Sequence, residues 1–234
     1  MGQGGDRTVT APDEDLEALA EAQAARGPVA LARAKAAVAS LSGRGRDAGA
    51  AELLRGAQKA ARRGKRIRLI LEAGSAWVAP LAPLAACREG CAACCHLPVA
   101  ITSAEAQLLS QASGRPVETP VGGQSVAELM EDPTAAAALA SGPRSGPVGP
   151  CPFLAGDRCG VYADRPLACR LHMNLDADAL LCQVVPGRPA QVPYADTRRM
   201  LAYALALQAD EVLADIRDFF PPRAEADAGP PSSG

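Results

Sequence analysis

All eight cysteines of this 234-residue chain lie between residues 87 and 182, and this clustering limits the fold more than any other feature. The first four follow the pattern Cys-x3-Cys-x2-Cys-Cys, whereas gaps of seven, nine and twelve residues separate the last four. Spacings as short as those of the first group let one turn aim several sulfurs at a common point, as zinc and iron–sulfur sites require. The candidate metal ligands are Cys87, Cys91, Cys94, Cys95, Cys151, Cys159, Cys169 and Cys182.

An even number of cysteines also fits a set of disulfides. The N-terminal residues Met-Gly-Gln-Gly-Gly-Asp lack the cationic and then apolar pattern of a secretory signal, so we expect a cytoplasmic protein with reduced thiols. The neighbours Cys94 and Cys95 cannot easily be bridged to each other without a strained turn. The sequence therefore favours a metal site, with Zn²⁺ or an iron–sulfur cluster of the 4Fe–4S type as the cofactor. The sequence leaves open whether the eight cysteines form one metal centre or two.

Composition sets the other limits on fold and partners. Aromatic residues make up only 3% of the chain, so the core must be built from Ala, Leu and Val, and a bound metal would add stability that such a core lacks. The net charge is −2 with acidic and basic residues interspersed, which argues against a nucleic-acid partner. No run of about 18 uninterrupted apolar residues predicts a membrane span. The expected partner is an unidentified protein or small molecule.

We expect a mostly α fold, with a helical bundle-like arrangement around an irregular cysteine-rich metal-binding centre and short extended segments. Ala and Leu favour helices and Gly and Pro interrupt them, so the N-terminal part should form three or four helices with breaks at Gly27-Pro28, at residues 42–46 and near Gly74. The predicted organisation is a disordered N-terminus (1–9), an Ala-rich helical region (10–83), a cysteine-cluster domain (84–185), a connector with a C-terminal helix packing on the domain (186–220), and a disordered tail (221–234).

Local patterns predict further elements. Residues 97–101 are apolar enough to be extended, and the capping-box pattern from Thr102 to Glu105 should open a helix that runs to about Ser110. A loop is expected over 113–123 and a helix over 125–139. Apolar residues from Leu201 to Phe220 recur at helical spacing and predict one long C-terminal helix, packed on the N-terminal helices.

Basic side chains accompany the cysteines. His96 follows Cys95 directly and His172 lies three residues after Cys169, and we expect both to hydrogen-bond near the site rather than to be ligands, although neutral imidazole suits zinc and iron. Four thiolates on Zn²⁺ or on a 4Fe–4S cluster leave a net charge of about −2, which nearby arginines can balance. The four candidates are Arg88, Arg158, Arg165 and Arg170.

Four ordered blocks make the cysteine region resemble the YkgJ-type cysteine cluster family, described as a zinc- or iron-chelating domain. The blocks are Cys87-Arg-Glu-Gly-Cys91-Ala-Ala-Cys94-Cys95, Cys151-Pro-Phe-Leu154, Cys159-Gly-Val-Tyr162 and Arg165-Pro166-Leu-Ala-Cys169-Arg170. The resemblance covers about residues 84–185 and implies metal chelation without an assigned reaction. Related clusters occur in bacterial flagellin lysine methylases, where an iron–sulfur cluster is implied.

The sequence is compatible with three functions. The chain could be a metal-binding module, an iron–sulfur-dependent enzyme of protein methylation or redox chemistry, or an interaction protein whose core is stabilised by a bound metal. The first three cysteines have the spacing of radical S-adenosylmethionine enzymes. However, Ala93 stands where those enzymes usually have an aromatic residue, and alternating strands and helices are not predicted downstream. The metal-binding module is the interpretation that the sequence supports best.

Overall fold

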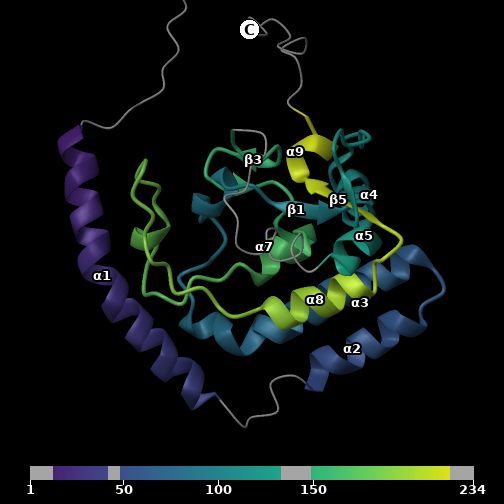
Figure 1. Cartoon of the computed structure of the whole chain (residues 1–234), viewed down its shortest axis with the longest axis horizontal. Helices are drawn as coiled ribbons and strands as arrows, with labels where there is room; N and C mark the ends of the chain where they lie inside the picture. The colour runs from purple at the N-terminus through teal and green to yellow at the C-terminus, as the bar shows by residue number, and fades with distance from the viewer. Residues whose placement is uncertain (1–12, 42–47, 133–148, 222–234) are drawn as a thin grey trace, which may run out of the picture.

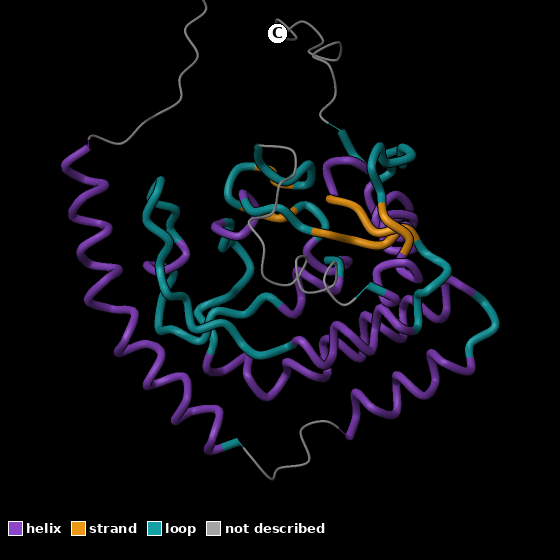
Figure 2. Tube along the Cα trace, viewed as in Figure 1, coloured by secondary structure: helices purple, strands orange, loops and turns teal. Residues whose placement is uncertain are grey.

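The computed structural model describes residues 13–41, 48–132 and 149–221, and this part of the chain is mostly helical, as predicted (Figure 1). Helices run along the lower edge and one side, while loops fill much of the centre and the strands are short (Figure 2). The predicted disordered ends 1–9 and 222–234, the break at 42–46 and residues 133–139 of the helix expected over 125–139 lie outside the described residues.

The N-terminal part forms three α-helices followed by a 3-10 helix: α1 (Asp13–Ser40), α2 (Ala48–Lys59), α3 (Arg63–Val78) and η1 (Ala79–Leu84). The predicted breaks at Gly27-Pro28 and Gly74 are wrong, because α1 and α3 continue through them. Tertiary contacts hold α1 helical around Pro28: the Gln23 side chain donates to the carbonyls of residues 180 and 183, and Arg26 forms a bidentate pair with the buried Asp176. Helix α1 is thus tied to the cysteine region as well as to the N-terminal core, which its Ala34 joins.

Helix α3 is the centre of the larger hydrophobic core. Its buried face, which includes Ile67, Ile70 and Ala73, packs with Ala-rich α2, with α7 (Leu167–Leu171) and with α8 (Arg198–Ala206). The predicted packing between N-terminal and C-terminal helices is therefore observed for α3 and α8. Among the described residues, the segment Arg63–Leu84 is long and apolar enough to cross a membrane by length and composition. Here it serves as a core helix.

A three-stranded antiparallel sheet lies beside this core in the order β1, β5, β2, where β1 is Ala100–Thr102, β2 is Gln124–Ser125 and β5 is Val212–Asp215. Strand β1 runs into α4 (Ser103–Ser113) through the predicted capping box: Thr102 Oγ1 accepts from the Glu105 N–H, and the Glu105 carboxylate accepts from the Thr102 N–H. Both residues are buried. The loop predicted after α4 is also present, and β2 leads into α5 (Val126–Glu131).

The single long C-terminal helix predicted from the apolar stripe is wrong. The stripe is divided between α8, strand β5 and the one-turn helix α9 (Ile216–Phe219). Residues 212–215 form the middle strand because β1 and β2 pair with their backbone on both sides. Asp215 then caps α9, its carboxylate accepting from the Arg217 N–H at 2.9 Å.

The cysteine region contains only short elements joined by loops. They are η2 (Ala93–His96), the hairpin of β3 (Leu154–Ala155) and β4 (Arg158–Cys159), η3 (Tyr162–Asp164), α7 and η4 (Leu180–Cys182). A second hydrophobic cluster lies under the hairpin and contains all three phenylalanines of the chain, Phe153, Phe219 and Phe220. The three phenylalanines thus lie together beside Cys151 and Cys159, which pack against the same cluster.

Candidate metal centre

The first four cysteines lie on the irregular segment that follows η1. Gly90 has a φ of +88°, a conformation that residues with a Cβ rarely adopt, and it forms the turn between Cys87 and Cys91. One turn of 3-10 helix, η2, then carries Cys94 and Cys95. All eight cysteines of the chain are free thiols and half-buried.

Asn174 lies fully buried between Cys87 and Cys182. Its backbone N–H donates to Cys87 Sγ at 3.2 Å, and its side-chain amide donates to Cys182 Sγ at 3.3 Å. Burial raises the pKa of Cys182 to about 11, and the hydrogen bond from Asn174 opposes that rise. Because N–H donors stabilise negative charge on sulfur, Asn174 suits two thiolates that bind a metal. The sequence analysis missed this residue.

The β3–β4 hairpin brings two more cysteines to the centre. Leu154 pairs with Cys159, and Gly156, with a φ of +57°, allows the tight turn between the strands. The Cys151 N–H donates to the Cys95 carbonyl at 2.7 Å, so the hairpin is fixed directly to the η2 turn. Both hairpin cysteines pack against the phenylalanine cluster, which shields their thiols from water on one side.

Cys169 is carried by α7, which close packing on α3 and a hydrogen bond from Leu167 hold in place. Gly74 lets α7 approach α3 closely, since a Cβ there would lie 2.3 Å from Leu167 Cδ1. The buried Glu105 carboxylate accepts from the Leu167 N–H at 2.7 Å. Burial raises the pKa of Cys169, and negative charge on Cys94, Cys151 or Cys159 raises it further. The Cys169 thiol therefore lies within electrostatic reach of cysteines from both sequence groups.

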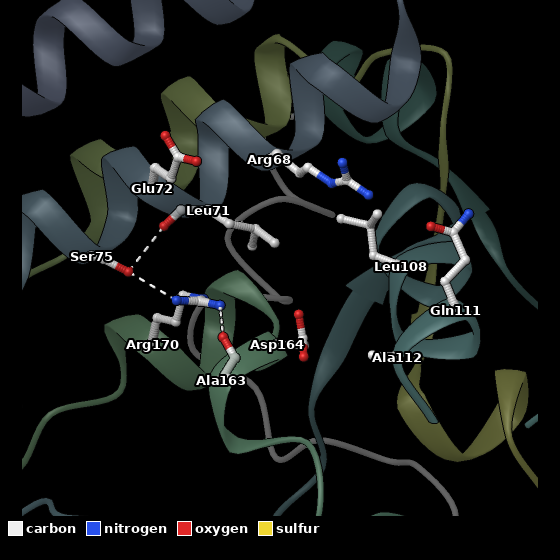
Figure 3. A pocket seen from close by; sticks show the side chains of 10 residues that line it. All are labelled: Arg68, Leu71, Glu72, Ser75, Leu108, Gln111, Ala112, Ala163, Asp164 and Arg170. Carbon is white, nitrogen blue, oxygen red and sulfur yellow. Dashed lines mark hydrogen bonds between the residues drawn. The ribbon is translucent and has the colours of Figure 1, made fainter. Parts of the chain in front are cut away.

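Arg170 holds α7 to its surroundings. Burial lowers the pKa of Arg170 overall, and negative charge on Cys169 opposes this change. The Arg170 guanidinium donates to Ser75 Oγ at 3.0 Å and to the Ala163 carbonyl at 2.6 Å (Figure 3). It also donates to the Arg165 carbonyl at 2.6 Å. A cavity of about 620 Å³ lies on this side of α7, and residues of α3 and α4 complete its lining. Arg170 is thus part of the scaffold of the site.

The vicinal thiols of Cys94 and Cys95 interact with each other. A hydrogen bond from Cys95 lowers the pKa of Cys94 to about 7, and the same interaction raises the pKa of Cys95. One thiolate of the pair therefore exists near neutral pH, which suits a metal ligand because the thiolate is the form that binds. Charges on Cys151 and Cys159 raise the pKa of Cys95 further, so these thiols are also neighbours.

The other three predicted charge-balancing arginines behave differently from one another. Arg88 and Arg158 are exposed. Burial raises the pKa of Cys87, and the positive charge of Arg165 opposes this rise. The charge of Arg165 also helps to lower the pKa of Cys94. Arg165 alone of these three thus acts on the cysteines through its charge.

A further arginine, Arg217 in α9, lies directly under the vicinal pair. Its side chain is only 4% exposed and forms an ion pair with Asp215 at 3.1 Å. It donates to three backbone carbonyls, those of Cys95 (3.3 Å), Leu97 (3.2 Å) and Gly149 (2.7 Å). Burial raises the pKa of Cys151, and the charge of Arg217 opposes that rise. The sequence carries no signal for this role, because 122 positions separate Arg217 from Cys95.

The two histidines lie in different surroundings. His96 is exposed at the end of η2. The His172 ring packs on that of Tyr194 with 4.1 Å between centroids, and its backbone carbonyl accepts from the Cys87 thiol at 3.7 Å. Their assignment as neighbours of the site rather than ligands stays a prediction.

Within the described residues, which include every cysteine, no three His, Cys, Asp or Glu side chains are close enough together to hold one metal ion. Negative charge on one of these thiols nonetheless raises the pKa of others, as expected for thiols that share one region of the fold. The cysteine side chains must rotate about their torsion angles for several sulfurs to lie about 2.3 Å from one zinc ion, which is the usual Zn–S distance. The donor set itself, eight thiols with N–H donors at two sulfurs, fits zinc or an iron–sulfur cluster.

Free thiols on several short segments share one loop-rich region of the fold, and thiols are the donors that metal-chelating proteins use. Residues 86–192 match the CxxCxxCC family model, which is described as "Putative zinc- or iron-chelating domain". This match covers the cysteine-rich part of the chain and confirms the resemblance found in the sequence. Neither a curated protein nor a solved structure matches the chain.

Proposed function

We propose that the chain is a metal-binding protein whose eight cysteines hold zinc or an iron–sulfur cluster. The observation that carries the proposal is that eight free thiols lie on the segment between η1 and η2, on η2 itself, at the β3–β4 hairpin, on α7 and on η4, with hydrogen-bond donors at two of the sulfurs. Thiolates are the ligands that zinc sites and iron–sulfur clusters share. The family match at residues 86–192 supports the same chemistry.

The role that we assign to the metal is to cross-link the centre of the fold. The elements that carry the later cysteines are very short: α7 has five residues and the strands of the hairpin have two each. Such elements gain little stability from their own hydrogen bonds, whereas metal binding adds free energy directly to folding. The proposal places the protein in a reducing compartment such as the cytoplasm, where thiols stay available to metal.

The test is anaerobic purification of the full chain followed by elemental analysis and a visible spectrum. The proposal predicts stoichiometric zinc in a colourless protein, or iron with acid-labile sulfide and a broad charge-transfer band. Protein that carries neither metal and fails to take up added zinc, or iron with sulfide, would contradict it. The spectrum also tests the hypothesis of an iron–sulfur-dependent enzyme, because a protein that binds only zinc would exclude it.

A substitution test links the metal to the thiols. The double variant Cys94→Ser, Cys95→Ser should lose metal while keeping the circular dichroism of the N-terminal helices. Replacement of the exposed Ser40 by Ala, which removes only a hydrogen bond to the Ala37 carbonyl, is the matched control and should keep full metal content. Unchanged metal in the double variant would show that the bound ion lies elsewhere.

A further inference from the structure

The cavity beside α7 lies between four elements that are distant in sequence, α3, α4, η3 and α7 (Figure 3). Its volume of about 620 Å³ falls within the range of about 300–1,000 Å³ that is usual for small-molecule sites. Among the residues that the structure describes, no cysteine lines it. The cavity is therefore a feature of the fold that the proposed metal site does not use.

The floor of the cavity combines an apolar part with a fixed guanidinium group. Leu71 is buried, and Leu108, Ser75 and Arg170 are half-buried. The Ser75 hydroxyl donates to the Leu71 carbonyl at 3.1 Å and accepts from Arg170 at 3.0 Å. Hydrogen bonds to Ser75 and to two backbone carbonyls use three of the five N–H groups of Arg170, which leaves two unused among the described residues. Arg170 is thus held in place with donors to spare.

The rim of the cavity carries charges of both signs. Arg68 and Glu72 lie one turn apart on α3, and Asp164 lies across the cavity at the end of η3 (Figure 3). All three are exposed. In the described part of the chain none of these three side chains forms an ion pair, whereas Arg63 and Arg66 on the same helix both have acidic partners. The charges of the rim are therefore available to a ligand.

From this lining we propose that the cavity binds a small zwitterion of the amino-acid or dipeptide type. Arg68 and Arg170 bind the carboxylate of the ligand, and the two acidic residues of the rim bind its ammonium group. The leucines of the floor contact its apolar part. A simple anion such as phosphate fits less well, because the carboxylates of Glu72 and Asp164 repel it.

The test measures binding of the dipeptide leucyl-leucine to the full chain by isothermal titration calorimetry. Its N-acetylated form lacks the ammonium group, its C-terminal amide lacks the carboxylate, and the doubly blocked form lacks both. The zwitterion should bind about 10-fold more tightly than either singly blocked form, because each block removes one charged hydrogen-bonding partner. The proposal is overturned by equal affinities for the four forms, by no binding of leucyl-leucine, or by tighter binding of inorganic phosphate.

Two variants link the binding to the cavity. Arg68→Gln should lower the affinity for leucyl-leucine about 10-fold but not that for its amide, which has no carboxylate. Asp164→Asn should likewise weaken the zwitterion but not the N-acetylated form, which has no ammonium group. Both side chains are exposed, so circular dichroism should show an unchanged fold. Arg33→Gln, at an exposed position of α1 outside the cavity, is the matched control and should bind as wild type does. Wild-type affinity in both cavity variants would contradict the assignment.

Discussion

Replacing Arg217 by Met should destabilise the protein far more than the same change at an exposed arginine. The Arg217 and Asp215 side chains are 4% and 8% exposed, and the guanidinium also serves three carbonyls. Removing one member of a buried ion pair costs about 3–5 kcal/mol, because the other charge is left without its partner. Here Asp215 keeps hydrogen bonds from the N–H groups of Val99 (2.7 Å) and residue 217 (2.9 Å), so the lower end, about 3 kcal/mol, is expected.

The chain supplies a matched control for this experiment. Arg198 pairs with Asp196 at the same sequence spacing and at 2.7 Å, but the two side chains are 84% and 64% exposed. With a urea m-value of about 2 kcal/mol/M, a loss of 3 kcal/mol lowers the unfolding midpoint by about 1.5 M. Arg198→Met should leave the midpoint almost unchanged, because exposed pairs contribute little. The assay is urea unfolding followed by circular dichroism, with and without bound metal.

A conservative variant separates the charge from the hydrogen bonds. Arg217→Lys keeps the positive charge beside Asp215, but a single ammonium group cannot reproduce the planar set of donors that reaches three carbonyls. Its unfolding midpoint should lie between those of wild type and Arg217→Met. Equal midpoints for Arg217→Met and Arg198→Met would refute the view that Arg217 supports the cysteine turn.

Three further predictions address packing, the sulfurs and pH. Gly74→Ala should destabilise by about 1–3 kcal/mol in thermal or urea unfolding, because its Cβ would lie 2.3 Å from Leu167 Cδ1, whereas Gly56→Ala has ordinary contacts and should not destabilise. Asn174→Asp replaces an N–H donor to sulfur by a carboxylate and should weaken zinc binding about 10–100-fold in chelator competition; unchanged affinity would contradict its assigned role. Burial alone would raise the pKa of Glu211, but hydrogen bonds lower it below 4.5 overall, so wild type should lose stability as pH falls below about 4.5. The variant Glu211→Gln should lack that part of the acid dependence, and identical pH profiles would exclude the effect.

The parts of the fold that could be predicted from sequence are those set by neighbouring residues. The capping box at Thr102 and Glu105 was predictable because its two partners are three positions apart, and both of its hydrogen bonds are formed. The C-terminal helix was not, because pairing with β1 and β2 outweighs the helical spacing of residues 212–215. The predicted helix break at Pro28 is wrong for a related reason. Hydrogen bonds from Gln23 and Arg26 to a distant loop keep α1 continuous.

The candidate site shows the same division between local and distant information. The choice of the cysteines as ligands rests on their spacing and on the four sequence blocks that resemble a known family, and it stays a prediction. Their supporting residues could not, because Asn174 and Arg217 reach the sulfurs or the η2 turn through contacts that span 87 and 122 positions. Arg170 was predictable in part: its charge interacts with that of Cys169, its neighbour in sequence, whereas its hydrogen bond to Ser75 spans 95 positions and could not be predicted.

X-ray absorption spectroscopy of the metal-loaded full chain tests the central claim most directly, because it measures which atoms bind the metal. If thiolates hold zinc, the first shell should contain four sulfurs at about 2.3 Å; an iron–sulfur cluster should likewise give sulfur as the main neighbour of iron. A first shell made mainly of nitrogen or oxygen at about 2.0–2.2 Å would contradict the cysteine-cluster assignment.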